Sequence, residues 1–160
     1  MNEKFLNWYN CIKLNMSLGE QARVFRETFR QDILPNISQY GFIKKQLWDM
    51  QVGLVKEECD EFLEAVDELY ADPENTDRRT EVVKELADLV FVCYQYAAAF
   101  NIDLDDAMNR VFESNMSKLD ENGCPIFRAD GKVLKGPNYK EPDLTHCAPT
   151  PNMYYDTHGK

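Results

Sequence analysis

Apolar residues recur through the middle of the chain with the period of a helix. They first alternate in steps of four and three, at Trp48, Val52, Val55, Cys59, Phe62, Val66 and Leu69. A second stripe with the same alternation comprises Val83, Leu86, Val90, Cys93, Ala97 and Phe100. These periods predict two long amphipathic helices, over about 42–70 and 78–100, that pack against each other along the two stripes.

Shorter helices are predicted on either side of this pair. Residues 1–15 carry enough apolar side chains for an amphipathic helix, and Ser17 with Glu20 forms a capping box that begins a helix reaching about residue 31. The residues of that helix expected to face inward are Leu18, Ala22, Phe25 and Phe29. Asn101 is expected to end the second long helix, and Asp103 to cap another one.

The character of the sequence changes after residue 122. The segment 123–135 predicts a β-hairpin that turns at Asp130-Gly131, and irregular chain containing prolines follows it. The sequence contains no strand–helix alternation and no glycine-rich phosphate loop. We therefore expect an all-α fold, a helical bundle with a small C-terminal β-hairpin, formed by one domain over residues 1–144 and an extended tail over residues 145–160.

Two pairs of acidic residues lie within the long apolar helices, Glu58 with Glu61 and Glu85 with Asp88. Each pair has i, i+3 spacing, so its two carboxylates project from one helix face. Antiparallel packing of the helices would bring four carboxylates together at the edge of a core. Like charges at short range raise each other's pKa unless a cation intervenes, and carboxylate oxygens are preferred ligands of Mg²⁺ and Mn²⁺. The alternative is a solvated acidic face; two such pairs beside apolar stripes favour the metal site.

Composition narrows the classes of function. With 18 Lys and Arg against 28 Asp and Glu, the net charge is −10, which argues against a protein that binds nucleic acid without sequence preference. No apolar run reaches membrane-spanning length, and the N-terminus does not resemble a signal peptide. The five cysteines form no CxxC pair, which suggests a reducing, cytoplasmic setting. A zinc site at Cys124, His146 and Cys147 is disfavoured by their spacing.

Asn115 and Lys118 continue, in phase, the apolar row Leu104, Met108 and Val111 of the last predicted helix. Polar residues at the end of a buried row have two interpretations. They either point inward and bind phosphate groups of a substrate, Lys118 by its charge and Asn115 as a donor, or the helix has left the core at that point. The period alone favours neither interpretation.

The spacing Glu57-Glu58-x-x-Glu61, followed after 23 intervening residues by Glu85-x-x-Asp88, resembles the all-α NTP pyrophosphohydrolases of the MazG-like superfamily. The resemblance continues in Ser114-Asn-Met-Ser-Lys118 and in the segment 130–135, Asp-Gly-Lys-Val-Leu-Lys. These look like the C-terminal part of phage-type and phosphoribosyl-ATP pyrophosphohydrolase-like members. The resemblance covers about residues 41–144 and is specific to the superfamily rather than to a substrate.

This resemblance implies a helical homodimer or homotetramer that hydrolyses a nucleoside triphosphate to the monophosphate and pyrophosphate. The metal, Mg²⁺ or Mn²⁺, would be held by Glu58, Glu61, Glu85 and Asp88. Glu57 or one of the ligand carboxylates Glu58 and Glu61 would serve as the base for the attacking water. Similar proteins use an Asn-x-x-Lys pair on phosphate, which favours the phosphate-binding interpretation of Asn115 and Lys118, and Lys132 and Lys135 would supplement it.

Four residues are candidates for a pocket that holds the base. Lys44 and Gln51 lie seven-residue steps before Glu58, on the same side of the long helix. Trp48 would stack on a base near the open end of the core, although a plain core role is the simpler interpretation. Tyr96 lies on the Glu85 face of the second helix and would line the same pocket.

The leading hypothesis is therefore a metal-dependent (deoxy)nucleoside triphosphate pyrophosphohydrolase of phage or bacterial nucleotide-pool control, with dGTP as the first candidate substrate, acting in the cytoplasm. The alternatives are a phosphoribosyl-ATP pyrophosphohydrolase and a non-catalytic helical oligomer that binds nucleotides. The phosphoribosyl-ATP reaction is less favoured at this stage because two N-terminal helices exceed what so compact a reaction module requires. A pure binding protein would not need all four acids.

Overall fold

A computed structural model describes residues 15–31 and 41–148 of the protein, without the side chains of residues 41–44. The described part contains four α-helices and no β-strand: α2 (Leu18–Thr28), α3 (Gly41–Ala71), α4 (Thr76–Ala99) and α5 (Leu104–Met116). The described residues form two compact units, one that ends at Ile102 and one over Asp103–Ala148. The all-α fold class is confirmed. The helix expected over residues 1–15 and most of the expected tail lie outside the described residues.

The capping box predicted at the start of α2 is present. The Glu20 backbone N–H donates to Ser17 Oγ at 3.1 Å, and the Ser17 N–H donates to Glu20 Oε2 at 2.8 Å, so two N-terminal donors are satisfied. Of the residues expected to face inward, Ala22 is buried, whereas Leu18 and Phe29 are exposed. The prediction was therefore wrong for those two residues.

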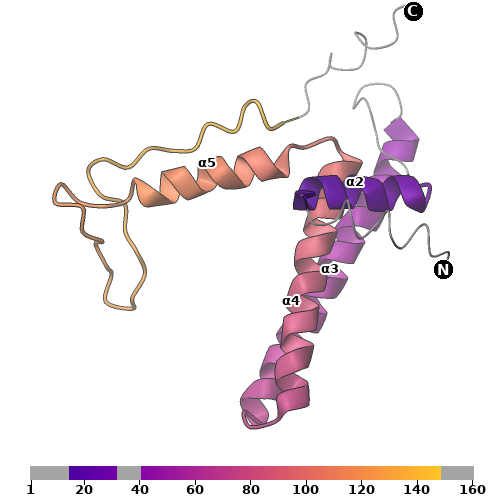
Figure 1. Ribbon diagram of the computed structural model, residues 1–160, viewed down its shortest axis with the longest axis horizontal. Coiled ribbons are helices and arrows are strands. Elements are labelled where there is room, and N and C mark those ends of the chain that lie inside the picture. Colours follow the sequence, from indigo (N-terminus) through magenta and orange to yellow (C-terminus); the bar gives the residue numbers. More distant parts are fainter. Residues whose placement is uncertain (1–14, 32–40, 149–160) are drawn as a thin grey trace, which may run out of the picture. The chain divides into compact units, whose positions relative to one another are not determined.

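Helices α3 and α4 form a long antiparallel pair, and α2 lies across the end of the pair opposite the turn (Figure 1). The turn falls at Asp72-Pro73, and Asn75 caps α4 by accepting hydrogen bonds from the Asp77 and Arg78 N–H groups. Asn101 follows α4 with φ of 55°, the left-handed conformation that asparagine tolerates better than most residues. The predicted stop at Asn101 is confirmed.

The faces that α3 and α4 turn toward each other differ from the predicted apolar stripes. In the predicted stripes, Trp48 is 52% exposed and Val83 is 68% exposed, and Leu86 and Val90 are also exposed. Ala97 and Phe100 of the second stripe are buried as predicted. The other buried residues lie outside the stripes: Leu47, Gln51 and Ala65 on α3, and Glu85, Val92, Tyr94, Gln95, Ala98 and Ala99 on α4. Each helix has apolar residues on more than one face, so spacing alone did not identify the face that meets its partner.

The apolar core of the first unit is concentrated at the end away from the turn. Leu47, Ala99 and Phe100 are buried together, with Tyr96 and Ile102 packed against them. Helix α2 is anchored to α4 by the edge-on contact of Phe25 with Phe91, whose ring centroids are 5.2 Å apart. Toward the turn, α3 and α4 meet through polar side chains, and the candidate site lies there.

The second unit consists of α5 and the irregular chain that covers one side of it. Asp103 caps α5 as predicted, by accepting a hydrogen bond from the Asp106 N–H at 3.0 Å. The predicted β-hairpin is reduced, within the described residues, to an isolated antiparallel bridge between Phe127 and Val133. Gly131 has φ of 86° in the turn between them, a conformation that glycine adopts without strain.

None of the described helices combines the length and the apolar character that a membrane span requires.

Candidate metal and catalytic site

Three carboxylates converge where α3 meets α4. One oxygen each from Glu58, Glu61 and Glu85 lies within 4.8 Å of the others. The i, i+3 spacing places Glu58 and Glu61 on one face of α3, and the antiparallel arrangement brings Glu85 of α4 opposite them. The structure thus brings together three of the four acids that the sequence singles out. Glu85 is buried, Glu58 is half-buried and Glu61 is exposed.

Glu85 is the buried member of this cluster, only 5% exposed. Its Oε1 accepts a hydrogen bond from the Lys84 ammonium at 2.6 Å, while its Oε2 is buried and has no hydrogen-bond partner. The Lys84 hydrogen bond lowers the pKa of the Glu85 carboxyl, which therefore stays ionised. A buried anionic oxygen without a partner is costly, and it is where an ion would be favoured.

The pKa values of two neighbouring carboxyls shift in the opposite direction, upward. The pKa of Glu58 is raised by burial and then by repulsion from Glu61, Asp88, Glu85 and Glu57. The pKa of Glu81 is raised, first through a hydrogen bond shared with the Glu85 carboxylate. Repulsion from neighbouring carboxylates contributes to both shifts after these first causes, and a divalent cation at this place would offset that repulsion.

Asp88, the fourth predicted acid, is not one of the three whose oxygens converge. Its Oδ2 lies 3.3 Å from Lys84 Nζ, and its charge raises the pKa of Glu58. Lys84 thus bridges two acids of α4, and the hydrogen bond to Glu85 raises the pKa of its ammonium. Sequence reasoning missed this lysine, although its i, i+4 spacing to Asp88 was visible.

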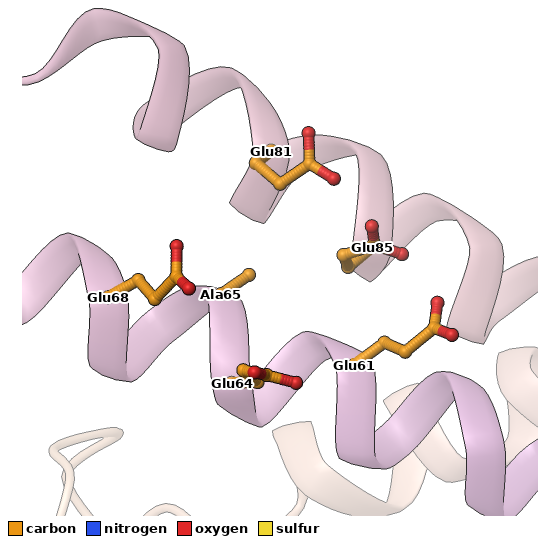
Figure 2. Close-up of a pocket in the computed structure, with 6 residues that line it drawn as sticks. All are labelled: Glu61, Glu64, Ala65, Glu68, Glu81 and Glu85. Carbon is orange, nitrogen blue, oxygen red and sulfur yellow. The ribbon is translucent and has the colours of Figure 1, made fainter.

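A pocket of about 290 Å³ continues from the cluster toward the turn between α3 and α4 (Figure 2). Ala65 is its small apolar member, and the other lining residues are all glutamates: Glu61, Glu64, Glu68, Glu81 and Glu85. Sequence reasoning did not name Glu64, Glu68 or Glu81. They could have been found from the sequence, because they continue the acidic pairs at helical spacing, 61-64-68 on α3 and 81-85 on α4. Glu57 is exposed beside Glu58.

The residues predicted to hold the base lie on the same two helices, away from the turn. Trp48, half exposed, contacts Tyr96 edge-on with ring centroids 6.0 Å apart and Phe100 at 5.3 Å. Gln51 is 1% exposed, so it belongs to the interior rather than to an open surface. Lys44 lies in the first turn of α3, and its side chain is outside the described part.

The residues predicted to bind phosphate all belong to the second unit. Lys118 Nζ donates to Asn115 Oδ1 at 2.7 Å, so the two meet at the C-terminal end of α5. Lys135 Nζ lies 4.0 Å from the ring centre of Tyr139 and 3.7 Å from Glu141, and Lys132 is exposed. Their approach to the carboxylate cluster of the first unit stays a prediction.

Comparison with known proteins identifies one family. The family model described as phosphoribosyl-ATP pyrophosphohydrolase matches residues 23–115. The matched region contains all four predicted acids and ends at Asn115, before Lys118. A search of curated proteins found no match.

Proposed function

Because the chain belongs to the phosphoribosyl-ATP pyrophosphohydrolase family, within the MazG-like all-α NTP pyrophosphatase superfamily, we propose that it hydrolyses a nucleotide phosphoanhydride bond and releases pyrophosphate. The family match establishes a hydrolase acting on phosphoanhydride bonds. The observation that carries the site assignment is the convergence of Glu58, Glu61 and Glu85 within 4.8 Å around a buried oxygen without a partner.

The family favours phosphoribosyl-ATP as the substrate, the reaction of histidine synthesis, over the dGTP that the sequence put first. The argument against phosphoribosyl-ATP was that two N-terminal helices exceed what the reaction module requires. It weakens, since the family match begins at residue 23, within the second of them, α2. A (deoxy)nucleoside triphosphate is the second candidate, because the converging acids would serve either triphosphate equally. Only the group attached to the triphosphate distinguishes the two.

The acid cluster fits a hard divalent cation, Mg²⁺ or Mn²⁺. Its donors are all carboxylate oxygens, and the unpartnered Glu85 Oε2 is a ligand atom with nothing else to bind. We assign Glu58, Glu61, Glu85 and Asp88 to holding it, with Lys84 neutralising Glu85 and Asp88 in its absence. When bound, the cation would neutralise the triphosphate and acidify a water.

The protein side chains then have separate tasks. The base for the attacking water is Glu57, which is exposed beside the cluster and is not among the proposed ligands, or one of the ligand carboxylates Glu58 and Glu61. Asn115 and Lys118 would bind the phosphates by hydrogen bonds and charge, supplemented by Lys132 and Lys135. That assignment rests on the resemblance and on the Asn115–Lys118 contact.

A homodimer or homotetramer is part of the proposal. Apolar residues of the α3–α4 pair that are exposed in the single chain include Leu63, Val66, Val83, Leu86 and Val90. A monomer would gain from covering so many large side chains on one helix pair. Light scattering of the purified protein would show which state it adopts.

The test is a product analysis with Mg²⁺ or Mn²⁺ on phosphoribosyl-ATP, dGTP, dCTP, dATP and dUTP, resolving pyrophosphate from single phosphate. We expect pyrophosphate and a monophosphate, with the highest kcat/KM on phosphoribosyl-ATP. The double variant Glu61→Gln with Asp88→Asn should abolish release, while Glu121→Gln, an exposed glutamate of the second unit, should not. Full pyrophosphate release by the double variant would overturn the site assignment.

A further inference from the structure

Two buried glutamines lie in the first unit, Gln51 on α3 and Gln95 on α4. Gln51 is 1% exposed, and neither its Nε2 nor its Oε1 has a hydrogen-bond partner. Gln95 is 4% exposed; its Nε2 donates to the Ala22 carbonyl at 3.2 Å, and its Oε1 has no partner. The interior therefore holds two acceptors and one amino group that are all unsatisfied.

The register of the helix pair places these amides at one level. Leu47 is buried together with Ala99, and Glu61 converges with Glu85. In both pairs the residue numbers add to 146 (47 with 99, 61 with 85), as they must along one antiparallel register. Gln51 and Gln95 add to the same number, so they lie opposite each other, between the apolar core and the acid cluster.

This arrangement is unfavourable for stability alone. Each buried polar group without a partner destabilises the fold, and an apolar side chain of the same size would avoid that cost. Surrounding core residues such as Leu47 and Val92 show that apolar side chains are accommodated between these helices. A ligand that supplies the missing partners would explain the two amides.

We propose that Gln51 and Gln95 bind the amino-bearing edge of a nucleobase, adenine in the substrate of the proposed function. A glutamine amide pairs in a bidentate way with the amino group and ring nitrogen of adenine, donating from Nε2 and accepting at Oε1. The free Gln95 Oε1 accepts the second amino hydrogen. A base with a keto oxygen at that position presents an acceptor in place of the amino group, so neither Oε1 accepts a hydrogen bond from it.

The surroundings fit a base that enters beside Trp48. Trp48 lies one turn before Gln51 on α3, is 52% exposed, and packs with Tyr96 and Phe100. A half-exposed indole provides a face on which a base stacks, and its movement opens a way to the amides below it. Gln51 is also seven residues before Glu58, about 10 Å along the helix axis, so one extended nucleotide reaches both.

The experiment uses phosphoribosyl-ATP as substrate and compares ATP with ITP as competing inhibitors, since these two differ at the base only in an amino or a keto group. The variant is Gln51→Met, which keeps the size and removes the amide. The control is Gln46→Met, at an exposed position of the same helix. Kinetics and thermal unfolding without nucleotide are measured for all three proteins.

We expect ATP to inhibit the wild type at about tenfold lower concentration than ITP. In Gln51→Met the KM should rise about tenfold with kcat within about twofold, the ATP preference should vanish, and the unfolding temperature should not fall. An unchanged KM and ATP preference in this variant would overturn the inference, and the amides would then hold buried water. If the wild type released no pyrophosphate from phosphoribosyl-ATP, the proposed substrate would be wrong. The role of the two glutamines would still be supported if ATP inhibited hydrolysis of another nucleotide more strongly than ITP did.

Discussion

The acids between α3 and α4 and the acids around α5 differ in how their surroundings shift their pKa values. Between the long helices, the pKa of Glu58 is raised by burial and then by neighbouring carboxylates, and that of Glu81 is raised through a hydrogen bond with Glu85; only Glu85, beside Lys84, has a lowered pKa, and its Oε2 is buried. In the second unit, every described carboxyl with a resolved shift has a lowered pKa, because a hydrogen bond to the ionised form stabilises it. These carboxyls are Asp106, Asp120, Asp130 and Asp143.

The difference separates acids that stabilise the fold from acids that the fold accommodates at a cost. Asp120 accepts hydrogen bonds from the Asn122 and Cys124 N–H groups and so fixes a turn of its own unit. The glutamates between α3 and α4 fix no such turn, and their mutual repulsion opposes helix packing. Unfavourable groups concentrated at one place are typical of a functional site.

The largest effect is expected from Glu85→Gln. Losing the buried carboxylate should lower pyrophosphate release on the order of a thousandfold, the scale seen when a principal electrostatic group is removed from an active site. Without metal, the unfolding temperature should fall, because the variant loses the ionised partner of the Lys84 ammonium, whose hydrogen bond lowers the pKa of Glu85. Activity assays with Mg²⁺ and thermal unfolding in EDTA check both parts. A variant that keeps full pyrophosphate release with Mg²⁺ would contradict the assignment of Glu85 to the site.

The backbone offers a second contrast, between two glycines. A Cβ at Gly136 would lie 2.3 Å from the Leu119 carbonyl oxygen and 2.7 Å from that of Lys118, whereas a Cβ at Gly53, within α3, would meet nothing within 4 Å. We expect Gly136→Ala to destabilise the second unit by about 3 kcal/mol. Gly53→Ala should stabilise the first unit by about 0.5–1 kcal/mol, because alanine favours the helix. Hydrogen exchange of peptides from each unit measures both; equal effects would contradict this contrast.

The sequence was informative where a local rule decides the structure. The Ser17–Glu20 capping box, the stop at Asn101 and the cap at Asp103 each depend on a few neighbouring atoms, and all three are present. The predicted pairing of apolar stripes was wrong for most of their length, although Ala97 and Phe100 are buried as expected, because the face that meets a neighbour is determined by the whole chain. Trp48 and Val83 are exposed for that reason.

The candidate site was foreseen in part on the same grounds. The i, i+3 spacing identified Glu58, Glu61 and Glu85, since spacing on one helix is a local property. The pairing of residues across the two helices, such as Gln51 of α3 at the level of Gln95 of α4, depends on the register of α3 against α4. No single helix encodes that register, so it was visible only in the folded chain.

A smaller effect is expected from Ser114→Ala in the second unit. Ser114 is 7% exposed, and its Oγ donates to the Lys140 carbonyl at 2.7 Å, which ties the covering chain to α5. Losing this hydrogen bond should lower the free energy of unfolding by about 1 kcal/mol. Urea denaturation of the full chain measures it, with Asn138→Ala at an exposed position as the control. No change in Ser114→Ala would mean that the covering chain is held by other contacts.

The smallest effect is a dependence on pH. Asp106 Oδ2 accepts from Arg110 Nε at 2.6 Å and from the Cys147 thiol at 3.3 Å, and the pKa of Asp106 is lowered below 3.8 by these hydrogen bonds, Arg110 first. Its ionised form therefore stabilises the fold above pH 3.8, and this contribution is lost as pH falls through the lower folded-state pKa. Asp106→Asn should reduce the free energy of unfolding at neutral pH. On acidification the variant should lose less stability than the wild type.

Substitution of Glu58 should change stability at pH 7 in the opposite direction from Asp106→Asn, when both variants are measured in EDTA. Its pKa in the folded state is raised above 4.5, so the ionised carboxylate opposes folding and protonation relieves that opposition. Glu58→Gln should therefore increase stability at pH 7, and the gain should shrink as pH falls through the raised pKa toward 4.5. Denaturation between pH 3 and 7 compares the two variants directly. If both substitutions changed stability in the same direction at pH 7, the two groups of acids would not differ as their surroundings indicate.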